Sequence, residues 1–579
     1  MHAHSEFEYA NNVQAQMEAS GWAVRPSSDY NTRFGILPAD LTAFLDATQP
    51  GHLYALATAG EEQFAADVRH AISKVGTAHA LKHGVDLNGR HLRLCGFKPQ
   101  SAATEVSAHN DYRHNRFSLV RELVFTPGGE ALRLDFALFL NGIPLFTFEI
   151  KSEMSAQSWT DAVEQYRRDR KPELGVILKP VEGALAHFAV SQEAVSFTTR
   201  LAGEDTHFLP FNPTYGYVKP ASHAYDTDYL WQQVMAPDSV LDLLEYFVFQ
   251  KPATHGPEVL FPRFHQLECV RHLKAAVLAE GPGQRYLQQH SAGSGKSNTI
   301  AWLASQLAYL TLDGKSKVFD KVLVVTDRLV LDRQLGDVLR FMHGGVIGQL
   351  VNCSHTRELG EALQDKTPIV VTTVQKFAFL DQVFSGDQRI DPGTLARVRS
   401  MRFAVIIDEA HSSQGGDYFA SMLKSLTAHL RAGREVPNVS FFAFTATPKN
   451  DTLELFGRKN RMGELEPFHA YSMKQAIDEG YILDVRKGYH QVETLYHVES
   501  TKPGEFVEKT RDVFRAIFND PEIVKAKAWE VVRVFSSSVA LELGGFAQGM
   551  VVCDSRMAAA RFKHAVDAIL AERGLPYKT

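Results

Sequence analysis

The chain has 579 residues, of which 45% are hydrophobic and 22% are charged, and its formal net charge is −6. This length is too great for a single hydrophobic core and predicts three or four domains. The negative net charge excludes a uniformly basic surface, although it allows a local basic groove for nucleic acid.

The cysteines and the apolar stretches indicate a cellular location. Four well-separated cysteines form no Cys-x-x-Cys pair, which argues against a disulfide framework or a zinc site. The N-terminal residues lack the basic start and apolar run of a signal peptide. No apolar stretch approaches the ~18 residues that suggest a membrane span. We therefore expect a soluble cytoplasmic protein without a membrane partner.

Hydrophobic periodicity predicts the elements in chain order. The first half is expected to hold helices over 5–20, 62–82 and 157–170, strands within 117–151 and 188–199, and a connection rich in Pro, Tyr, Asp and His over 208–228. From about residue 285, β-rich runs alternate with helical patterns, which indicates a mostly parallel sheet covered on both faces. A second such pattern begins at GMVVCDS (549–555). The fold class is therefore multidomain α/β.

The segment HSAGSGKSNTI (290–300) follows a predicted strand and opens a predicted helix, which is the context of a phosphate-binding loop. Backbone N–H groups and the helix N-terminus can hold phosphate oxygens. Lys296 is expected to reach the β and γ phosphates and Ser297 to bind Mg²⁺. The pattern departs from GxxxxGK[ST] at its first position, which is His290. The competing interpretation is a glycine-rich turn with a solvated lysine. The predicted loop residues are Gly293, Ser294, Gly295, Lys296 and Ser297.

A second nucleotide motif is FAVIIDEAH (403–411), in which two carboxylates follow an apolar strand. Asp408 is expected to bind Mg²⁺, and Glu409 to polarise the attacking water. By itself this pattern is also compatible with a strand end followed by a helix cap.

In this order GSGKS, DEAH and TATP (445–448) resemble the first motor domain of superfamily 2 helicases and translocases. The resemblance covers 261–448. It implies ATP as cofactor, with Gln266 and neighbouring Arg263 in the adenine-reading segment FPRFHQ (261–266). It also implies motifs that hold the DNA backbone, TDRLVLDRQ (326–334) and TTVQKF (372–377). The implied DNA contacts, which would position the duplex without reading its sequence, are Arg328, Thr373 and Lys376.

The run LRLDFALFLNGIPLFTFEIK (132–151) places charges inside two apolar strands. Ionised groups there require a partner, a metal or a chemical role. Glu149 and Lys151 share one strand face because they are two residues apart. The pattern D-x(13)-E-x-K resembles the PD-(D/E)xK nuclease core, in which Asp135 and Glu149 would bind Mg²⁺ and Lys151 would orient the attacking water. Leu134 replaces the preceding proline, and a surface salt bridge on an edge strand is the alternative.

The hairpin geometry makes the metal site testable. A two-residue Asn-Gly turn with a regular ladder pairs Asp135 with Phe148, which puts Glu149 on the other face. A three-residue loop or one bulge pairs Asp135 with Glu149 instead. Pro144 has no N–H and favours such an irregularity. We therefore predict an irregular hairpin.

Other residues bear on this nuclease interpretation. Glu8, on the first predicted helix, is expected to lie near the metal. The helix containing DAVEQYRRDR (161–170) is expected to bring Gln165 and Tyr166 toward DNA or Lys151. The resembled family carries QxxxY here, which Tyr166 fits, whereas position 162 is Ala.

A nuclease core followed by a superfamily 2 motor resembles the restriction (R, HsdR) subunit of type I restriction enzymes. NGIPLFTFEIK, DEAHSSQGG and FGRKN…YSMKQAIDEGYIL (456–483) carry this resemblance. It implies an ATP-dependent endonuclease that joins methyltransferase (M) and specificity (S) subunits, pumps double-stranded DNA and cuts it. The expected domains are a nuclease over 1–225, a first RecA-like domain over 226–460 and the start of a second over 461–579.

Later motifs of the second RecA-like domain are absent, so the sequence predicts a fragment or truncated product with weak ATPase activity and no processive translocation. Two alternatives remain open at this point. One is a standalone helicase-nuclease of another defence or repair system, and the other is a DNA-binding remnant with an inactive motor.

Overall fold

The computed structural model describes most of the chain. The described residues are 6–56, 60–99, 106–128, 131–152, 157–252, 256–312, 314–326, 336, 338–339, 350–377, 396–398, 400, 401–410, 437–482, 484, 520–540 and 548–579. The chain divides into two units, Met1–Lys487 and Gly488–Thr579.

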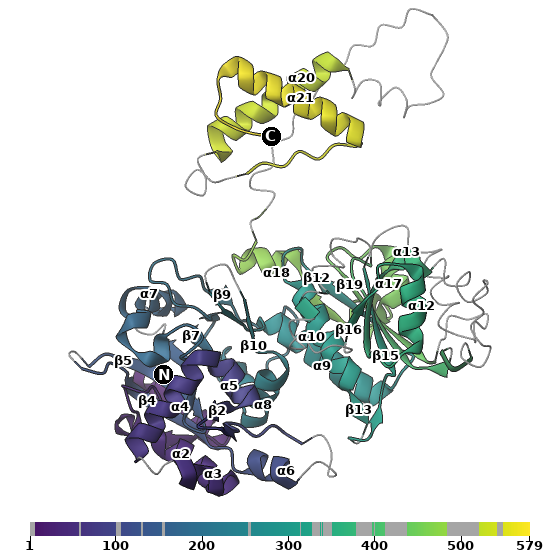
Figure 1. Ribbon diagram of the computed structural model, residues 1–579. Coiled ribbons are helices and arrows are strands. Elements are labelled where there is room, and N and C mark those ends of the chain that lie inside the picture. The colour runs from purple at the N-terminus through teal and green to yellow at the C-terminus, as the bar shows by residue number, and fades with distance from the viewer. Residues whose placement is uncertain are drawn as a thin grey trace, which may run out of the picture. The chain divides into compact units, whose positions relative to one another are not determined.

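The first half of the larger unit is built on a mixed sheet (Figure 1). Its strands, in spatial order, are β1 (Ala23–Arg25), β4 (Phe117–Val124), β5 (Arg133–Leu140), β6 (Ile143–Ile150), β7 (Ala186–Val190), β8 (Val195–Thr198) and β9 (Leu209–Pro210). Strands β4, β5 and β6 are antiparallel, whereas β7 runs parallel to β6. The strand β6 is therefore central, and all eight of its residues are buried.

Helices surround this sheet. They are α1 (Glu6–Ala19), α2 (Pro38–Thr48), α3 (Pro50–Leu56), α4 (Glu61–Val75), α5 (Thr77–His83), α6 (Val106–Arg113), α7 (Trp159–Asp169) and α8 (Pro237–Tyr246), and a small hairpin joins β2 (Val85–Leu87) to β3 (Arg90–Leu92). The helix α7 begins with a capping box at Ser158 and Asp161, which satisfies N–H groups that a helix start otherwise leaves unpaired. Residues of β5 alternate between clusters on the two sheet faces, with Phe136 and Leu138 in one and Ala137 and Phe139 in the other.

The hairpin between β5 and β6 is irregular, as the sequence predicted. Near the turn, Leu140 pairs with Ile143 and Phe139 with Pro144, but Leu138 pairs with Phe146. Leu145 has no opposite residue and therefore forms a bulge next to Pro144. Beyond the bulge Phe136 pairs with Phe148, so the same register sets Asp135 opposite Glu149.

The second half of the larger unit holds a parallel sheet (Figure 1). Its strands, in spatial order, are β16 (Leu350–Asn352), β17 (Ile369–Thr373), β15 (Lys321–Thr326), β18 (Phe403–Ile407), β19 (Val439–Thr445), β12 (Arg285–His290) and β22 (His469–Tyr471). All six neighbouring pairs are parallel. The β-rich runs expected from the sequence form β12, β15, β17, β18 and β19, so the parallel sheet of a RecA-like domain is confirmed.

Both faces of the parallel sheet are covered. The helices of this region are α9 (Phe264–Glu280), α10 (Lys296–Tyr309), α12 (Thr356–Gln364), α13 (Val374–Phe377), α17 (Asn450–Phe456) and α18 (Met473–Asp478). Val322 and Val324 of β15 join the cluster that contains α9 and α10, whereas Leu323 and Val325 join the cluster that contains α12. Burial on both faces explains why these strands are continuously apolar.

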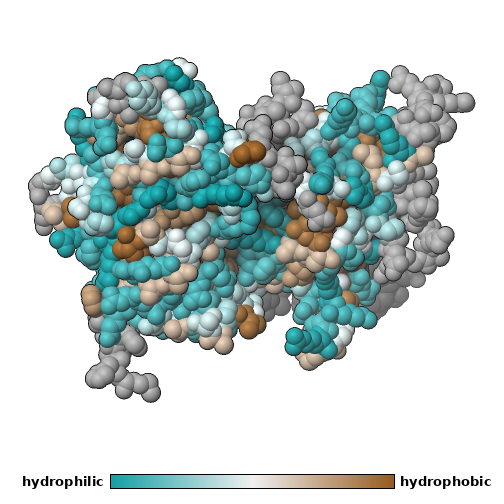
Figure 2. All heavy atoms as spheres, turned by 90° about the horizontal axis from the view of Figure 1, so that it is seen from below, coloured by the Kyte–Doolittle hydropathy of each residue, from teal (hydrophilic) through white to brown (hydrophobic). Residues whose placement is uncertain are grey.

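The two sheets of the larger unit share one apolar cluster. Phe261, which precedes α9, packs against Phe146 of β6 and Phe197 of β8, with ring centroids 5.9 and 5.2 Å apart. Figure 2 shows mainly hydrophilic side chains over the visible face, with apolar ones in separate patches. Among the described residues, no helix has the length and apolar character needed to cross a membrane.

The smaller unit contains a helical pair, α20 (Pro521–Val534) and α21 (Arg556–Arg573), whose apolar side chains form one small cluster. The prediction of a strand at 549–555 was wrong, because 549–553 have no regular secondary structure and Met550 and Val552 are exposed. A parallel strand requires a neighbour that supplies hydrogen bonds. Within the described residues of this unit there is no such strand.

The hairpin turn supplies a test of the fold. Gly142 has a φ of +78°, and an added Cβ would lie 2.3 Å from the carbonyl oxygen of Leu37. We expect Gly142→Ala to lower the melting temperature of the protein, because it adds both backbone strain and a backbone clash, at a cost above about 1 kcal/mol. Gly89→Ala is the control, since Gly89 has a similar φ of +76° with nothing within 4 Å of an added Cβ. Equal melting temperatures for the two variants would contradict the packing of this turn.

Candidate functional site

The paired acids of the hairpin lie at one end of the mixed sheet. The bulge at Leu145 brings Asp135 and Glu149 to the same face. Asp135 Oδ2 accepts a hydrogen bond of 2.7 Å from the backbone N–H of Ile150. The two carboxylates are close enough for the charge of Asp135 to raise the pKa of Glu149. The structure therefore brings together the two acids that the sequence singled out.

Glu149 is fully buried, and one of its two carboxylate oxygens is paired with Arg170, a residue that sequence reasoning missed. Its Oε1 accepts a hydrogen bond of 2.6 Å from Nε of Arg170, the C-cap residue of α7. Burial, followed by the charge of Asp135, raises the pKa of Glu149 well above its usual range, although Arg170 opposes this shift. Among the described residues, Glu149 Oε2 has no hydrogen-bond partner.

Arg170 is held in place on several sides. Its Nη2 donates to the carbonyl oxygen of Arg133 at 2.7 Å, and its guanidinium lies over the ring of Phe125. Tyr166 precedes Arg170 by four residues, so the helical repeat sets both on one face of α7. That spacing was the one sequence signal for Arg170.

Lys151 lies on the same strand face as Glu149, and its side chain is 11% exposed. Its Nζ is 3.7 Å from Oε1 of Glu6, in the first turn of α1. Burial raises the pKa of Glu6, and Asp135 raises it further, whereas Lys151 lowers it. A third carboxylate therefore faces the pair formed by Asp135 and Glu149.

The expectation for Glu8 is corrected by this geometry. Glu6 contacts Lys151, whereas Glu8 is exposed and exerts its charge on Tyr225. Residues two positions apart in an α-helix are separated by about 200° around its axis, so Glu6 and Glu8 point in nearly opposite directions. The helix was predicted correctly, but its rotation about its own axis was not.

Tyr166 takes a structural position rather than the expected contact with DNA or Lys151. It is fully buried, and its hydroxyl lies 2.8 Å from Oγ1 of Thr147 on β6. Thr147 in turn bonds Nδ1 of His187 at 2.7 Å. Gln165 is partly exposed on α7. Tyr166 therefore anchors α7 to the central strand and so positions Arg170.

The predicted phosphate-binding loop connects β12 to α10. Gly293 and Gly295 have φ values of 75° and 83°, a left-handed conformation that favours glycine. Lys296 and Ser297 are the first residues of α10, where N–H groups and the helix dipole favour an anion. Lys296 Nζ lies 3.4 Å from Oε1 of Glu409. The two nucleotide motifs expected from the sequence thus meet in space.

The acids of the second motif follow the carboxyl end of β18. Asp408 is buried, and its Oδ1 accepts a hydrogen bond of 3.0 Å from the backbone N–H of Glu409. Glu409 has a φ of 52°, which is uncommon for a non-glycine residue and is found at functional sites. In open α/β sheets ligands bind outside the carboxyl ends of the strands. The residues of both motifs lie there, namely Lys296, Ser297, Asp408 and Glu409.

Gln266 and Arg263 lie behind the loop. Gln266 Nε2 donates to the carbonyl oxygens of Ser294 and Gly295 at 3.3 and 3.1 Å, and its Oε1 accepts from the backbone N–H of Arg263. The Arg263 side chain is buried, donates to the Tyr471 hydroxyl at 2.7 Å and lies over the Tyr481 ring. Gln266 therefore supports the loop in this conformation, and its role as adenine reader stays a prediction.

The structure describes two of the three residues that were expected to contact DNA. Arg328 lies outside the described residues. Thr373 is buried at the end of β17, and Lys376 is also buried, with Nζ donating to the carbonyl oxygen of Cys353 at 2.6 Å. The Lys376 ammonium group is thus satisfied inside the domain in this conformation, and its contact with the DNA backbone stays a prediction.

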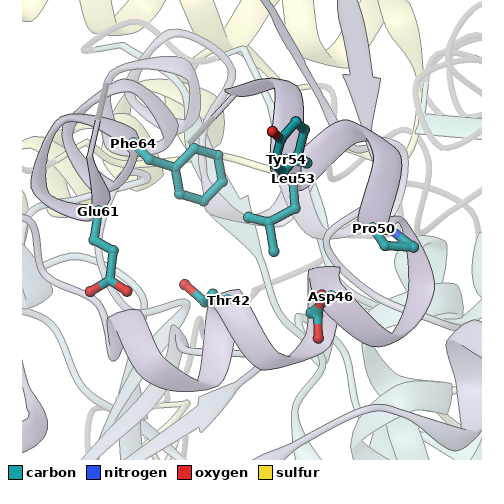
Figure 3. A pocket seen from close by; sticks show the side chains of 7 residues that line it. All are labelled: Thr42, Asp46, Pro50, Leu53, Tyr54, Glu61 and Phe64. Atoms are coloured by element: carbon teal, nitrogen blue, oxygen red, sulfur yellow. The ribbon is translucent and has the colours of Figure 1, made fainter. Parts of the chain in front are cut away.

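A surface pocket of about 430 Å³ lies elsewhere, among α2, α3 and α4. Figure 3 shows Leu53 and Phe64 pointing into it, with Asp46 and Glu61 at its margin. It contains none of the residues that the sequence singled out, so we assign it no part in either site.

These features define a chain in which a mixed-sheet domain with paired acids precedes a RecA-like domain that carries a glycine-rich loop. Residues 97–206 match the family described as type I restriction enzyme R protein N terminus, and residues 265–517 match the SWI2/SNF2 ATPase family. The chain is therefore similar to the R subunits of type I restriction enzymes, and the resemblance expected from the sequence is confirmed.

Individual relatives agree with this. The chain is 26% identical over 419 residues to a putative type I restriction enzyme MjaIXP endonuclease subunit from Methanocaldococcus jannaschii, a match that covers 68% of this chain and 36% of that protein. It is 28% identical over 398 residues to the type I restriction enzyme HindI endonuclease subunit from Haemophilus influenzae, which covers 64% of this chain and 35% of that protein. The chain thus spans just over a third of the length of these two relatives.

A solved structure was also matched, described as a fragment of a putative HsdR subunit of a type I restriction enzyme from Vibrio vulnificus YJ016. The match has 15% sequence identity and a TM-score of 0.34, and covers 79% of this chain and 72% of that one.

The buried pair of Glu149 and Arg170 generates a prediction. Breaking a buried ion pair leaves an uncompensated charge and costs about 3–5 kcal/mol, so Arg170→Gln should lower the melting temperature strongly. Arg168→Gln is the control on the same helix, because Arg168 is 68% exposed in its ion pair with Glu164, and such pairs contribute about 0–1 kcal/mol.

The pH dependence of this deficit has a defined sign. Arg170 lowers the pKa of Glu149, so its loss raises that pKa further in the folded state only. Burial already raises this pKa in the wild-type fold, so just above the ordinary carboxyl pKa, near about 4.3, both folded proteins keep the proton and lose stability alike as pH rises. Above the raised wild-type pKa only the folded variant still keeps it, so its stability alone continues to fall. The melting-temperature deficit of Arg170→Gln should therefore be larger at a pH above the raised wild-type pKa than in acid. A deficit that is independent of pH would contradict the coupling.

Proposed function

We propose that this chain is the nuclease and ATPase portion of an ATP-dependent type I restriction endonuclease subunit, and that it moves double-stranded DNA and cuts it. The observation that carries the proposal is the presence of two built sites in one chain. One holds Asp135, Glu149 and Lys151 on a single sheet face, and the other sets Lys296 against Glu409 at the carboxyl ends of parallel strands.

The residues at the nuclease site fit a divalent cation. Glu149 Oε2 is buried without a partner among the described residues, and Asp135 is close enough to raise the pKa of Glu149. Hard cations such as Mg²⁺ take carboxylate oxygens as ligands, and Asp135 and Glu149 would supply them. Such an ion neutralises phosphate charge and lowers the pKa of a bound water.

The chain's own residues would prepare the cut in four ways. Arg170 occupies one oxygen of Glu149 and orients the other. Lys151 is mostly buried and can hold the attacking water through its ammonium group. Glu6 keeps Lys151 in place through a contact of 3.7 Å. The buried hydrogen bond between Tyr166 and Thr147 fixes the helix that carries Arg170.

The nucleotide site works by charge and geometry. The backbone N–H groups of Gly293, Ser294 and Gly295 and the start of α10 would hold the phosphates of ATP. Lys296 would exchange Glu409 for the γ-phosphate, which frees Glu409 to orient water. Ser297 and Asp408 would hold the Mg²⁺ ion of the nucleotide. Because nucleotide binding separates Lys296 from Glu409, it prepares the base at the same time.

One part of the proposal reaches beyond this chain: recognition of the DNA sequence belongs to the methyltransferase and specificity subunits of a type I complex. Within the chain, we assign residues 1–225 to the nuclease and residues from 226 to the first RecA-like domain. That domain extends past the expected boundary at 460, because its sheet includes β22 (His469–Tyr471), and the smaller unit, Gly488–Thr579, is assigned to the beginning of a second one. The longer type I endonuclease subunits among its relatives support this assignment.

The two sites should fail independently. Asp135→Asn should abolish metal binding at the nuclease site, measured by calorimetry with Mn²⁺ in nucleotide-free protein, and leave the affinity for ATP unchanged. It should also lower DNA cleavage by at least about 100-fold in a complex reconstituted with the partner subunits, because the metal ligands act as a unit.

Lys296→Ala should weaken ATP binding at least about tenfold, since it removes a charge-assisted contact to phosphate, and leave Mn²⁺ binding at the nuclease site intact. Lys317→Ala is the matched control, because Lys317 is an exposed lysine of the same domain. An Asp135→Asn protein that cleaves DNA at the normal rate would refute the nuclease assignment, and undiminished ATP binding by Lys296→Ala would refute the nucleotide site.

A further inference from the structure

A cluster of metal-ligating side chains lies beneath the phosphate-binding loop. Cys269 comes from α9, His290 is the last residue of β12, and His469 is the first residue of β22. All three are buried, and one ligand atom from each lies within 4.8 Å of the others. The three residues are distant in sequence, so the tertiary structure alone brings them together.

A carboxylate behind the cluster orients one imidazole. Glu268 Oε2 lies 3.1 Å from Nε2 of His469, and Nδ1 of His469 lies 2.9 Å from Nε2 of His290. With its Nε2–H donated to Glu268, His469 directs the lone pair of Nδ1 into the cluster. A histidine ligand that donates its other N–H to a carboxylate is the usual arrangement at protein metal sites. Glu268 is itself held by Thr214, whose hydroxyl donates to Oε2 at 2.9 Å.

Nε2 of His290 and the lone pair on Nδ1 of His469 face each other at 2.9 Å, so a proton or a metal ion must lie between these two nitrogens. If His290 donates its Nε2–H to His469, its Nδ1 becomes an acceptor that needs a donor. His290 is fully buried, and among the described residues its Nδ1 has no hydrogen-bond partner. An unsatisfied buried polar atom costs about 1–3 kcal/mol.

We propose that Cys269, His290 and His469 bind a divalent transition-metal ion of the zinc class. One sulfur and two imidazole nitrogens suit Zn²⁺ and are poor ligands for Mg²⁺. Binding replaces the thiol proton of Cys269, which leaves to solvent, and the resulting thiolate and the Glu268 carboxylate balance the two positive charges of the ion.

The position of the ion defines its role as a structural staple. It joins the helix that carries Gln266, the strand that leads into the phosphate-binding loop and the edge strand β22. Gln266 bonds the loop from below, and Ser291 at the start of the loop donates its N–H to the carbonyl oxygen of Tyr471. The staple is distinct from both proposed catalytic sites, since it uses none of their acids.

The test is the metal content of the full chain, produced without a histidine tag and measured by elemental analysis. We expect about one zinc ion per chain. Cys269→Ala should lose it, whereas Cys353→Ala should keep it, because Cys353 is also buried but lies in the other apolar cluster of the parallel sheet. Replacement by Co²⁺ should give a thiolate charge-transfer band that Cys269→Ala abolishes.

A milder variant separates the metal from the folding of the domain. Glu268→Gln keeps the shape of the side chain but removes its charge, and should weaken zinc binding about 10–100-fold in a competition with a chelator. Wild-type protein that holds no zinc after dialysis against Zn²⁺, or equal zinc content in Cys269→Ala and wild type, would overturn the proposal. Neither result affects the assignments for ATP or DNA, so the zinc proposal can be refuted independently of the proposed function.

Discussion

One extra residue in the hairpin, Leu145, determines whether the two acids of the proposed nuclease site share one face of the sheet. Side chains of a strand alternate between faces, so a shift of one residue moves every side chain to the opposite face. With a regular ladder Asp135 would face Phe148, and Glu149 would point toward the apolar cluster on the far side. The bulge restores the two acids to one face. Its cost is a broken ladder beside Pro144, a residue that cannot donate a ladder hydrogen bond.

Burial then sets the chemistry of these acids. Glu149 lies on a central strand whose eight residues are all buried, and desolvation raises its pKa. Arg170 prevents the full penalty by neutralising one carboxylate oxygen. The other oxygen has no hydrogen-bond partner among the described residues, so it is the atom that a proton or the proposed cation would take. The fold thus holds a partly compensated acid at the point where the proposed cation would bind.

The nucleotide-binding half relies on a different constraint. Parallel strands end at one edge of the sheet, so β12 and β18 deliver Lys296, Asp408 and Glu409 to one place although they are over 100 residues apart in sequence. The nuclease half touches this region through the segment after β9. Tyr215 bonds Gln475 and Asp478 of α18, and Thr214 bonds Glu268 of α9. The two halves of the larger unit are therefore in direct polar contact.

The sequence by itself determined most strands of the two sheets, the helices α1, α4 and α7, the loop that precedes α10 and the identity of the charged residues, because these follow from local periodicity and short motifs. It also foresaw the irregular hairpin, since Pro144 stands inside that strand. Tertiary structure alone decided that Glu6 rather than Glu8 faces Lys151, that Arg170 pairs with Glu149, and that Lys376 is buried. Cysteine spacing argued against zinc, yet Cys269 meets His290 and His469 in space. These four outcomes depend on the rotation of a helix about its axis or on the distant element that it packs against. A local sequence pattern encodes neither the rotation nor the packing partner.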